Sequence, residues 1–178
     1  MVLTTSQAKL QTGSSAPDFR LKGVDGKIHS ADEFAGLLLV IFMCNHCPYV
    51  LAKIGSITRL QEKFAGKATI AGINSNNPAY PGEGFENMKK FAREQGINFP
   101  YLIDETQSVA KAYGAVCTPD PFLFDKNRKL VFHGRIDNAL ELDAKATEQT
   151  MENNINKVLR GERIKGFEPS MGCSIKWK

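Results

Sequence analysis

Apolar residues form short, uninterrupted runs in this chain, and between them they recur every three or four positions. Residues 37–43 are apolar throughout, and residues 68–73 nearly so. Uninterrupted apolar runs of this length are typical of strands buried on both faces of a central sheet. The sequence therefore predicts two buried strands near the centre of the fold.

Helical spacing follows the first of these strands. From Pro48 onward the apolar residues stand three or four positions apart, and Gly66 ends the pattern. This spacing predicts an amphipathic helix. Similar patterns predict helices at 85–95, at 106–113 and, with Asp143 as its cap, in a last segment that Gly161 ends. The apolar positions of the first helix are Val50, Ile54, Ile57, Leu60 and Phe64.

Turn residues and alternation predict the remaining strands. We expect a hairpin over 16–29, a short strand at 101–103 and a second hairpin over 122–132. The alternation of strands and helices predicts an α/β fold with a central mixed sheet flanked by helices. We expect one domain over residues 15–165, a flexible lead-in over 1–14 and an irregular, flexible tail over 166–178.

Composition and charge restrict the partners and the location that we expect for this domain. The 178 residues carry a formal net charge of +4, spread without a dense basic stripe. That pattern argues against nucleic acid as a partner. The longest apolar run is too short to cross a bilayer, and the N-terminus lacks the apolar core of a signal peptide. We therefore expect a soluble cytoplasmic protein with no membrane partner.

Four cysteines supply the candidate chemistry, and two of them, Cys44 and Cys47, form a C-x-x-C between the first buried strand and its helix. Unpaired N–H groups and the helix dipole at a helix N-terminus stabilise a thiolate. We expect Cys44 to be the more exposed, attacking thiolate, and Cys47 to close a disulfide with it. A partly protonated His46 would stabilise the thiolate further, making the disulfide more oxidising than the roughly −270 mV of thioredoxin.

Two other interpretations of the C-x-x-C are half of a zinc site and a purely structural pair of thiols. Zinc needs four ligands, usually including a second closely spaced pair. Cys117 and Cys173 stand alone, and the histidines form no H-x-x-x-H. We therefore expect neither a metal nor a cofactor.

These segments together resemble the thioredoxin superfamily, in its redoxin or peroxiredoxin-like (AhpC/TSA-type) branch. Residues 37–64 resemble the first strand, the C-x-x-C and the first long helix of that superfamily, and 16–27 the N-terminal hairpin of this branch. Residues 113–125, with Thr118-Pro119, resemble the segment where the fold places a cis-proline against the dithiol, and 172–177 the tail of the branch. The resemblance covers roughly residues 15–178.

The resemblance implies an activity, thiol–disulfide exchange, and roles for individual residues. Cys44 would attack, Cys47 would resolve, Pro119 would be cis, and Thr118 would offer backbone hydrogen bonds to a substrate. Substrates would be protein or small-molecule thiols and disulfides, with a separate electron donor, and the chain could pair as a homodimer. The sequence departs from its relatives at three positions. Met43 stands where thioredoxins usually have Trp, Leu38 replaces their buried acid, and Pro121 interrupts the usual start of the strand after Pro119.

Peroxide reduction is an alternative function, because peroxiredoxins resemble the chain overall. Their P-x-x-x-T-x-x-C motif aligns its cysteine with Cys47, its threonine with Cys44 and its proline with Val40. The threonine and proline of the peroxide pocket are therefore missing, although Arg135 could supply its cation. A third alternative is a redox-sensing or docking module without turnover.

The other two cysteines have open roles. Cys117 precedes Pro119 by two residues and is either a third redox thiol or a small buried apolar residue. Cys173, in the predicted flexible tail, could reach back to Cys117 or Cys44. We expect either a Cys117–Cys173 disulfide in the oxidised protein or a tail thiol with no redox role.

Overall fold

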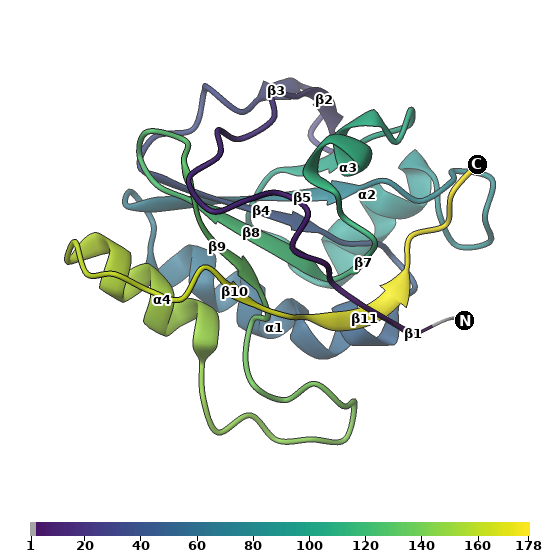
Figure 1. The fold of residues 1–178 in the computed structure, drawn as a ribbon. Coiled ribbons are helices and arrows are strands. Elements are labelled where there is room, and N and C mark those ends of the chain that lie inside the picture. The colour runs from purple at the N-terminus through teal and green to yellow at the C-terminus, as the bar shows by residue number, and fades with distance from the viewer. Residues whose placement is uncertain (1–2) are drawn as a thin grey trace.

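Eleven strands and four helices make up the computed structural model, which describes residues 3–178. Eight strands form one mixed sheet in the order β10-β9-β8-β4-β5-β6-β2-β3, and three form a small sheet in the order β1-β11-β7 (Figure 1). The helices are α1 (Pro48–Lys63), α2 (Phe85–Glu94), α3 (Ser108–Tyr113) and α4 (Thr150–Leu159). The strands of the large sheet are β2 (Arg20–Gly23), β3 (Ile28–Ser30), β4 (Leu37–Phe42), β5 (Ala68–Asn74), β6 (Tyr101–Ile103), β8 (Asp120–Phe124), β9 (Leu130–Gly134) and β10 (Phe167–Glu168). Those of the small sheet are β1 (Leu3–Thr5), β7 (Cys117–Thr118) and β11 (Met171–Ser174).

The central position of β4 explains its uninterrupted apolar sequence. It pairs in parallel with β5 and antiparallel with β8, and every one of its residues is buried. The predicted α/β architecture with a mixed sheet is thereby confirmed. The N-terminal hairpin is present as the β2–β3 pair at one edge of that sheet.

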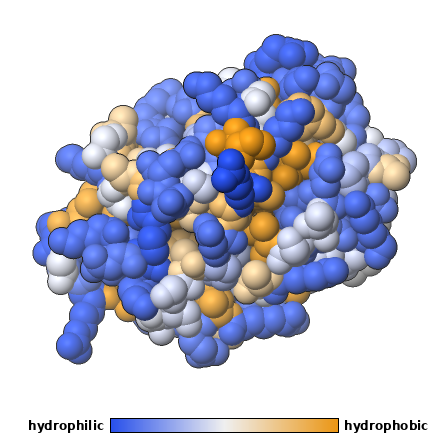
Figure 2. All heavy atoms as spheres, turned by 90° about the horizontal axis from the view of Figure 1, so that it is seen from above, coloured by the Kyte–Doolittle hydropathy of each residue, from blue (hydrophilic) through white to orange (hydrophobic). Residues whose placement is uncertain are grey.

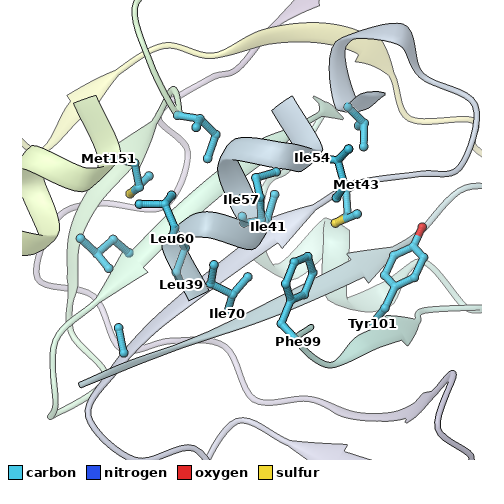
Figure 3. Close-up of a cluster of buried hydrophobic side chains, with 14 of the residues drawn as sticks. Leu39, Ile41, Met43, Ile54, Ile57, Leu60, Ile70, Phe99, Tyr101 and Met151 are labelled. Carbon is cyan, nitrogen blue, oxygen red and sulfur yellow. The ribbon is translucent and has the colours of Figure 1, made fainter. Parts of the chain in front are cut away.

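Alternate residues of β4 face two separate cores. Leu39, Ile41 and Met43 pack with buried side chains of α1, α2 and α4 (Figure 3). Leu38, Val40 and Phe42 pack on the opposite face, with α3 and the segment that carries Phe19 and Phe34. β4 ends at Phe42, and the C-x-x-C begins two residues later, still inside the core.

The lead-in and the tail, which we expected to be flexible and the tail irregular, each contain strands. Leu3–Thr5 form β1, which pairs antiparallel with β11, so that the first and last strands lie side by side (Figure 1). β11 pairs in turn with β7, and β10 joins the main sheet beside β9. Because backbone hydrogen bonds to distant partners hold these short strands, their side chains gave no local pattern. For residues 1 and 2 the prediction lies outside the described part of the chain.

The start of the last helix also differs from the prediction. α4 begins at Thr150 after Gln149, so Asp143 is not its cap. Buried Met151 and Ile155 define its inner face.

The surface seen from above in Figure 2 is mainly hydrophilic, with an apolar band across its centre. Within residues 3–178, no helix combines the length and apolarity that a bilayer crossing requires.

Candidate active site

The two cysteines of the C-x-x-C lie at the junction of the most buried strand and the longest helix. β4 ends at Phe42, Cys44 follows, and Cys47 is the N-cap of α1, with Pro48 in the first turn. Proline suits that position because its missing N–H would be unpaired there and its φ angle is already helical. The strand and the proline together hold the two sulfur atoms at the helix start.

A cis peptide bond joins Thr118 to Pro119, as the resemblance implied. Thr118 contacts both sulfur atoms of the dithiol. Its Oγ1 lies 3.4 Å from Cys44 Sγ, and its carbonyl oxygen lies 3.2 Å from Cys47 Sγ, where it can accept a hydrogen bond whenever Cys47 is protonated. Thr118 therefore lies at the dithiol and contacts both of its sulfur atoms.

The structure places the lower thiol pKa on Cys47. A hydrogen bond from the Cys44 thiol, helped by Cys173 and by the N–H groups of Val50 and Cys173, lowers the pKa of Cys47 from 9.0 to about 5, against the opposing effect of burial. Donors at a helix N-terminus act on a sulfur as they do on an oxygen anion. These interactions favour the thiolate on Cys47 in the reduced pair.

Cys44 differs from the sequence prediction in both exposure and charge. Its side chain is 1% exposed, so it is not the open thiol that we expected. Its hydrogen bond to Cys47, together with burial and the nearby Glu83 carboxylate, holds the pKa of Cys44 well above its usual range. These pKa shifts favour the thiolate on Cys47, against the direction predicted for Cys44, because the interaction between the two thiols lowers the pKa of Cys47 and raises that of Cys44. Which thiol attacks a substrate stays a prediction.

His46 lies beside the dithiol but interacts with a carboxylate. Its Nδ1 contacts Glu83 Oε1, and its ring stacks on Tyr80 at 5.0 Å. Its Nε2 is buried without a hydrogen-bond partner among the described residues. The tuning role that we predicted for His46 would therefore act through its pairing with Glu83.

Glu83 is a functional candidate that the sequence analysis missed. It is 3% exposed, and its two carboxylate oxygens accept hydrogen bonds from the Asn45 backbone and the side-chain amides of Asn45, Asn74 and Asn76. A buried carboxylate is costly unless hydrogen bonds satisfy it. The signal in the sequence was the cluster of asparagines directly after β5, because amides are the donors that a buried acid needs.

Cys173 is part of the site, contrary to the expected mobile tail. β11 places its side chain in the core, with its Sγ 2.7 Å from Cys47 Sγ. Burial and the hydrogen bond to Cys47 raise the pKa of Cys173 to about 12. None of the four cysteines, all within residues 3–178, is in a disulfide. The structure thus brings three thiols together rather than two.

Cys117 lies close in sequence to Pro119 but contacts a different set of groups. Its Sγ is 3.9 Å from Ser170 Oγ, and the pairing of β11 with β7 sets Ser174, not Cys173, opposite it. Burial, followed by the charge of Asp120, raises the pKa of the Cys117 thiol. These contacts favour the interpretation of Cys117 as a buried apolar residue over a disulfide with Cys173.

Asp120 and His133 form a second buried polar pair behind the cis-proline. His133 Nε2 lies 2.7 Å from Asp120 Oδ1, and both side chains are at most 1% exposed. Arg135 nearby is bound by Glu168 at 2.8 Å, so its guanidinium is paired with a carboxylate rather than with a cysteine. The expectation that Arg135 could be the cation of a peroxide pocket has no support in this geometry.

One group of side chains could hold a metal ion. Ligand atoms of Cys44, His46 and Glu83 lie within 4.8 Å of one another. We expected no metal, and the three side chains have other contacts: His46 pairs with Glu83, Glu83 accepts from the neighbouring amides, and Cys44 contacts Thr118. The chemistry that this arrangement most directly provides is that of the thiols.

Two pockets differ in how near they lie to the site. A pocket of about 20 Å³ beside Pro119 is lined by Tyr49, Lys53 and Met171, among others. A pocket of about 710 Å³ lies elsewhere, beside Leu37 and Val158. Leu37 begins the strand that ends at the site, so this larger pocket is separated from the thiols by roughly 20 Å of extended strand. The small pocket is the one next to the chemistry.

A helix-capping dithiol against a cis-proline, on a central mixed sheet, defines a thioredoxin-fold thiol–disulfide oxidoreductase. The sequence profile of the AhpC/TSA family matches residues 12–133, and the chain belongs to that family.

Two solved structures and a curated relative resemble this chain. A crystal structure of an uncharacterized conserved protein from Geobacillus kaustophilus has a TM-score of 0.93 and 37% identity, covering 100% of this chain and 97% of that one. A hypothetical protein from Sinorhizobium meliloti 1021 has a TM-score of 0.92 and 37% identity, covering 98% and 99%. The thiol-disulfide oxidoreductase ResA of Geobacillus thermodenitrificans is 28% identical over 130 residues, or 71% of this chain and 70% of ResA.

Proposed function

We propose that the protein exchanges dithiols and disulfides through the Cys44–Cys47 pair, with Cys44 forming the mixed disulfide and Cys47 resolving it. The observation that carries this proposal is that Thr118, before the cis-proline, contacts both sulfurs of the C-x-x-C, at 3.4 Å from Cys44 Sγ and 3.2 Å from Cys47 Sγ. Such a pair shares one negative charge, so that one thiol can attack while the other waits to release the product.

Proton transfer within the pair prepares Cys44 for attack. In the resting protein Cys47 is the thiolate and the Cys44 thiol donates to it. When the proton moves to Cys47, the Thr118 carbonyl accepts from the new thiol and the Thr118 hydroxyl donates to the Cys44 thiolate. The cis-proline loop thus stabilises the reactive tautomer, and Cys47 acts as the base for Cys44.

Protein or small-molecule disulfides are the proposed substrates, with a separate thiol as electron donor. ResA, which resembles this chain, carries thiol-disulfide oxidoreductase in its name. Because the thiols are buried, a substrate would have to displace the loop or strand that covers them. A cytoplasmic location and a homodimer are further proposals, the first from composition and the second from the family resemblance. An antioxidant role would follow from the peroxide-reducing alternative.

Mixed-disulfide trapping tests the proposal. A peptide with one internal disulfide is mixed with the reduced wild type, with Cys47→Ser and with Cys44→Ser, and the products are mapped by mass spectrometry. We expect peptide reduction by the wild type and a stable adduct on Cys44 in Cys47→Ser. An adduct found only on Cys47, in Cys44→Ser, would reverse the order of the thiols. Neither reduction nor any adduct would reject exchange.

Peroxide reduction stays as a second candidate because Cys47 is a thiolate at the position that the peroxiredoxin motif gives to its reactive cysteine. The missing threonine and the pairing of Arg135 with Glu168 predict slow turnover. Peroxide consumption with a thiol reductant, and sulfenic acid on Cys47, would support it. A docking module would show neither activity and would still bind its partner as Cys44→Ser.

A further inference from the structure

We propose that Cys173 is a second resolving thiol for Cys47, so that Cys47 alternates between a disulfide with Cys44 and a disulfide with Cys173. This inference rests on the proposed exchange activity and adds a step to it. In that step the oxidising equivalent passes from the C-x-x-C to the C-terminal strand and leaves Cys44 as a thiol.

Cys47 is the central sulfur of the three. It shares a hydrogen bond with Cys44, and its Sγ lies 2.7 Å from Cys173 Sγ. A disulfide bond is about 2.05 Å long. The sulfurs of Cys47 and Cys173 therefore need to approach by less than about 1 Å to bond.

The strand that carries Cys173 is built to lie this close. Cys173 pairs with Thr118, the residue whose hydroxyl and carbonyl contact the dithiol. Next to it, a Cβ on Gly172 would come within 1.9 Å of the Thr118 carbonyl oxygen. Only glycine lets the two backbones approach to this distance. The close approach of β11 is thus a property of the backbone and not of one side-chain rotamer.

Bonds on both sides hold the strand in place. Before it, the backbone N–H of Ser170 donates to Ser6 Oγ at 2.9 Å. After it, the N–H of Lys176 donates to Asn76 Oδ1 at 2.8 Å, and the Lys176 carbonyl accepts from Asn77 and Gln107. A segment with these anchors presents Cys173 to Cys47 at a fixed place.

The exchange is balanced within the chain. Starting from the Cys44–Cys47 disulfide, the Cys173 thiol loses its proton and its sulfur attacks Cys47 Sγ. The Cys47–Cys173 bond forms, the Cys44–Cys47 bond breaks, and Cys44 leaves as a thiolate that takes up a proton. One disulfide is consumed and one is formed, so that no external oxidant or reductant enters the step.

The charge state of Cys47 determines when Cys173 ionises and can attack. In the reduced protein the Cys47 thiolate is one of the causes that raise the pKa of Cys173. A Cys47 that is bonded to Cys44 carries no charge, so this cause disappears. Cys173 therefore ionises more easily at the stage at which it has to attack.

Disulfide mapping tests the inference. Reduced wild type, Cys44→Ser and Cys117→Ala are each treated with one equivalent of diamide, quenched with acid, alkylated under denaturing conditions and digested without reductant. We expect a Cys47–Cys173 peptide in the wild type and Cys117→Ala, and as the main product in Cys44→Ser. Cys117→Ala is the matched control because Cys117 is an equally buried thiol on the neighbouring strand. In steady-state peptide reduction, we expect Cys173→Ser to lower turnover by about tenfold when the electron donor is limiting.

Each outcome separates the two proposals. If Cys44→Ser yields no Cys47–Cys173 peptide while the wild type still reduces disulfides, this inference is wrong and the proposed function stands. Cross-links that involve Cys117 as often as Cys173 would also overturn it, because oxidation would then be unselective. A wild type that forms the Cys47–Cys173 bond but reduces no disulfide contradicts the proposed function instead.

Discussion

Cys47 and Cys117 are both 0% exposed and both lie against the cis-proline loop, yet their thiols have opposite properties. The pKa of Cys47 is lowered to about 5, whereas burial raises the pKa of Cys117. Burial disfavours a thiolate in both places. The difference comes from the groups around each sulfur.

Donors surround Cys47, and an acid lies near Cys117. The pKa of Cys47 is lowered by interactions with the Cys44 thiol, the Cys173 thiol and two backbone N–H groups. Cys117 has the Ser170 hydroxyl at 3.9 Å and the charge of Asp120. The comparison shows that the groups next to each sulfur, above all a second thiol beside Cys47, separate the two pKa values at equal burial.

The largest expected effect is a loss of disulfide-exchange rate when Cys47, but not Cys117, is removed. Cys47→Ala should lower disulfide exchange by at least about a thousandfold, because the resolving sulfur and the base for Cys44 are lost together. Cys117→Ala, which removes a thiol of equal burial, should stay within about twofold. Steady-state reduction of a disulfide peptide measures both. Equal losses in the two variants would contradict the division between these thiols.

The pH dependence of the reduced protein sharpens the same contrast. Ultraviolet absorbance of the thiolate should show one group ionising with a pKa of about 5 in the wild type and in Cys117→Ala. Cys47→Ser should lose this transition, because the donors then face a hydroxyl that does not ionise. Retention of the transition in Cys47→Ser would place the thiolate on another cysteine.

Stability should follow the same ionisation. The pKa of Cys47 is lower in the folded protein than its ordinary value of 9.0, so the folded state binds this proton less tightly. The stabilisation is complete above about pH 9 and disappears as the pH falls through about 5. Urea denaturation of the reduced protein at several pH values between these limits should show the wild type losing its advantage over Cys47→Ser on acidification.

Local patterns in the sequence were sufficient for the central part of the fold. The apolar run of β4 and the three- and four-residue spacing of α1 both report burial that each element produces by itself. The C-x-x-C lay between them, so the site could be placed at a helix start. The cis Thr118–Pro119 bond followed from the resemblance and is confirmed.

Contacts between segments that are distant in the sequence could not be predicted from the sequence alone. Cys173 meets Cys47 across 126 residues, and Glu83 meets His46 across 37. Neither contact leaves a periodic signal, because each depends on a short strand or loop held by partners elsewhere in the chain. The order of ionisation was missed for a related reason. The spacing C-x-x-C does not say which sulfur caps the helix, and here it is Cys47.

A smaller effect, on stability, should follow from blocking the close approach of β11. Gly172→Ala would place a Cβ 1.9 Å from the Thr118 carbonyl oxygen and should lower the free energy of unfolding by about 3 kcal/mol. Gly55→Ala is the control, because its Cβ meets nothing nearer than Arg59 at 3.5 Å. That helical position should gain roughly 0.5–1 kcal/mol. A neutral Gly172→Ala in urea denaturation would show that β11 does not depend on this approach.

The smallest effect is expected on the Cys44 side of the pair, at Glu83. Glu83→Gln should cost about 1–3 kcal/mol, because the new amide turns N–H groups toward the asparagine amides that now donate to the carboxylate. Glu86→Gln, three residues along and exposed, should change stability by less than about 0.5 kcal/mol.

The same variant probes the electrostatics of the dithiol. The Glu83 charge is one of the causes that raise the pKa of Cys44, so Glu83→Gln should lower the second ionisation of the pair and leave the first, on Cys47, nearly in place. Thiolate absorbance during an alkaline titration of the reduced protein measures it, with Glu86→Gln as the reference. If Glu83→Gln changes the pKa of the first ionisation instead, the Glu83 carboxylate acts mainly on Cys47.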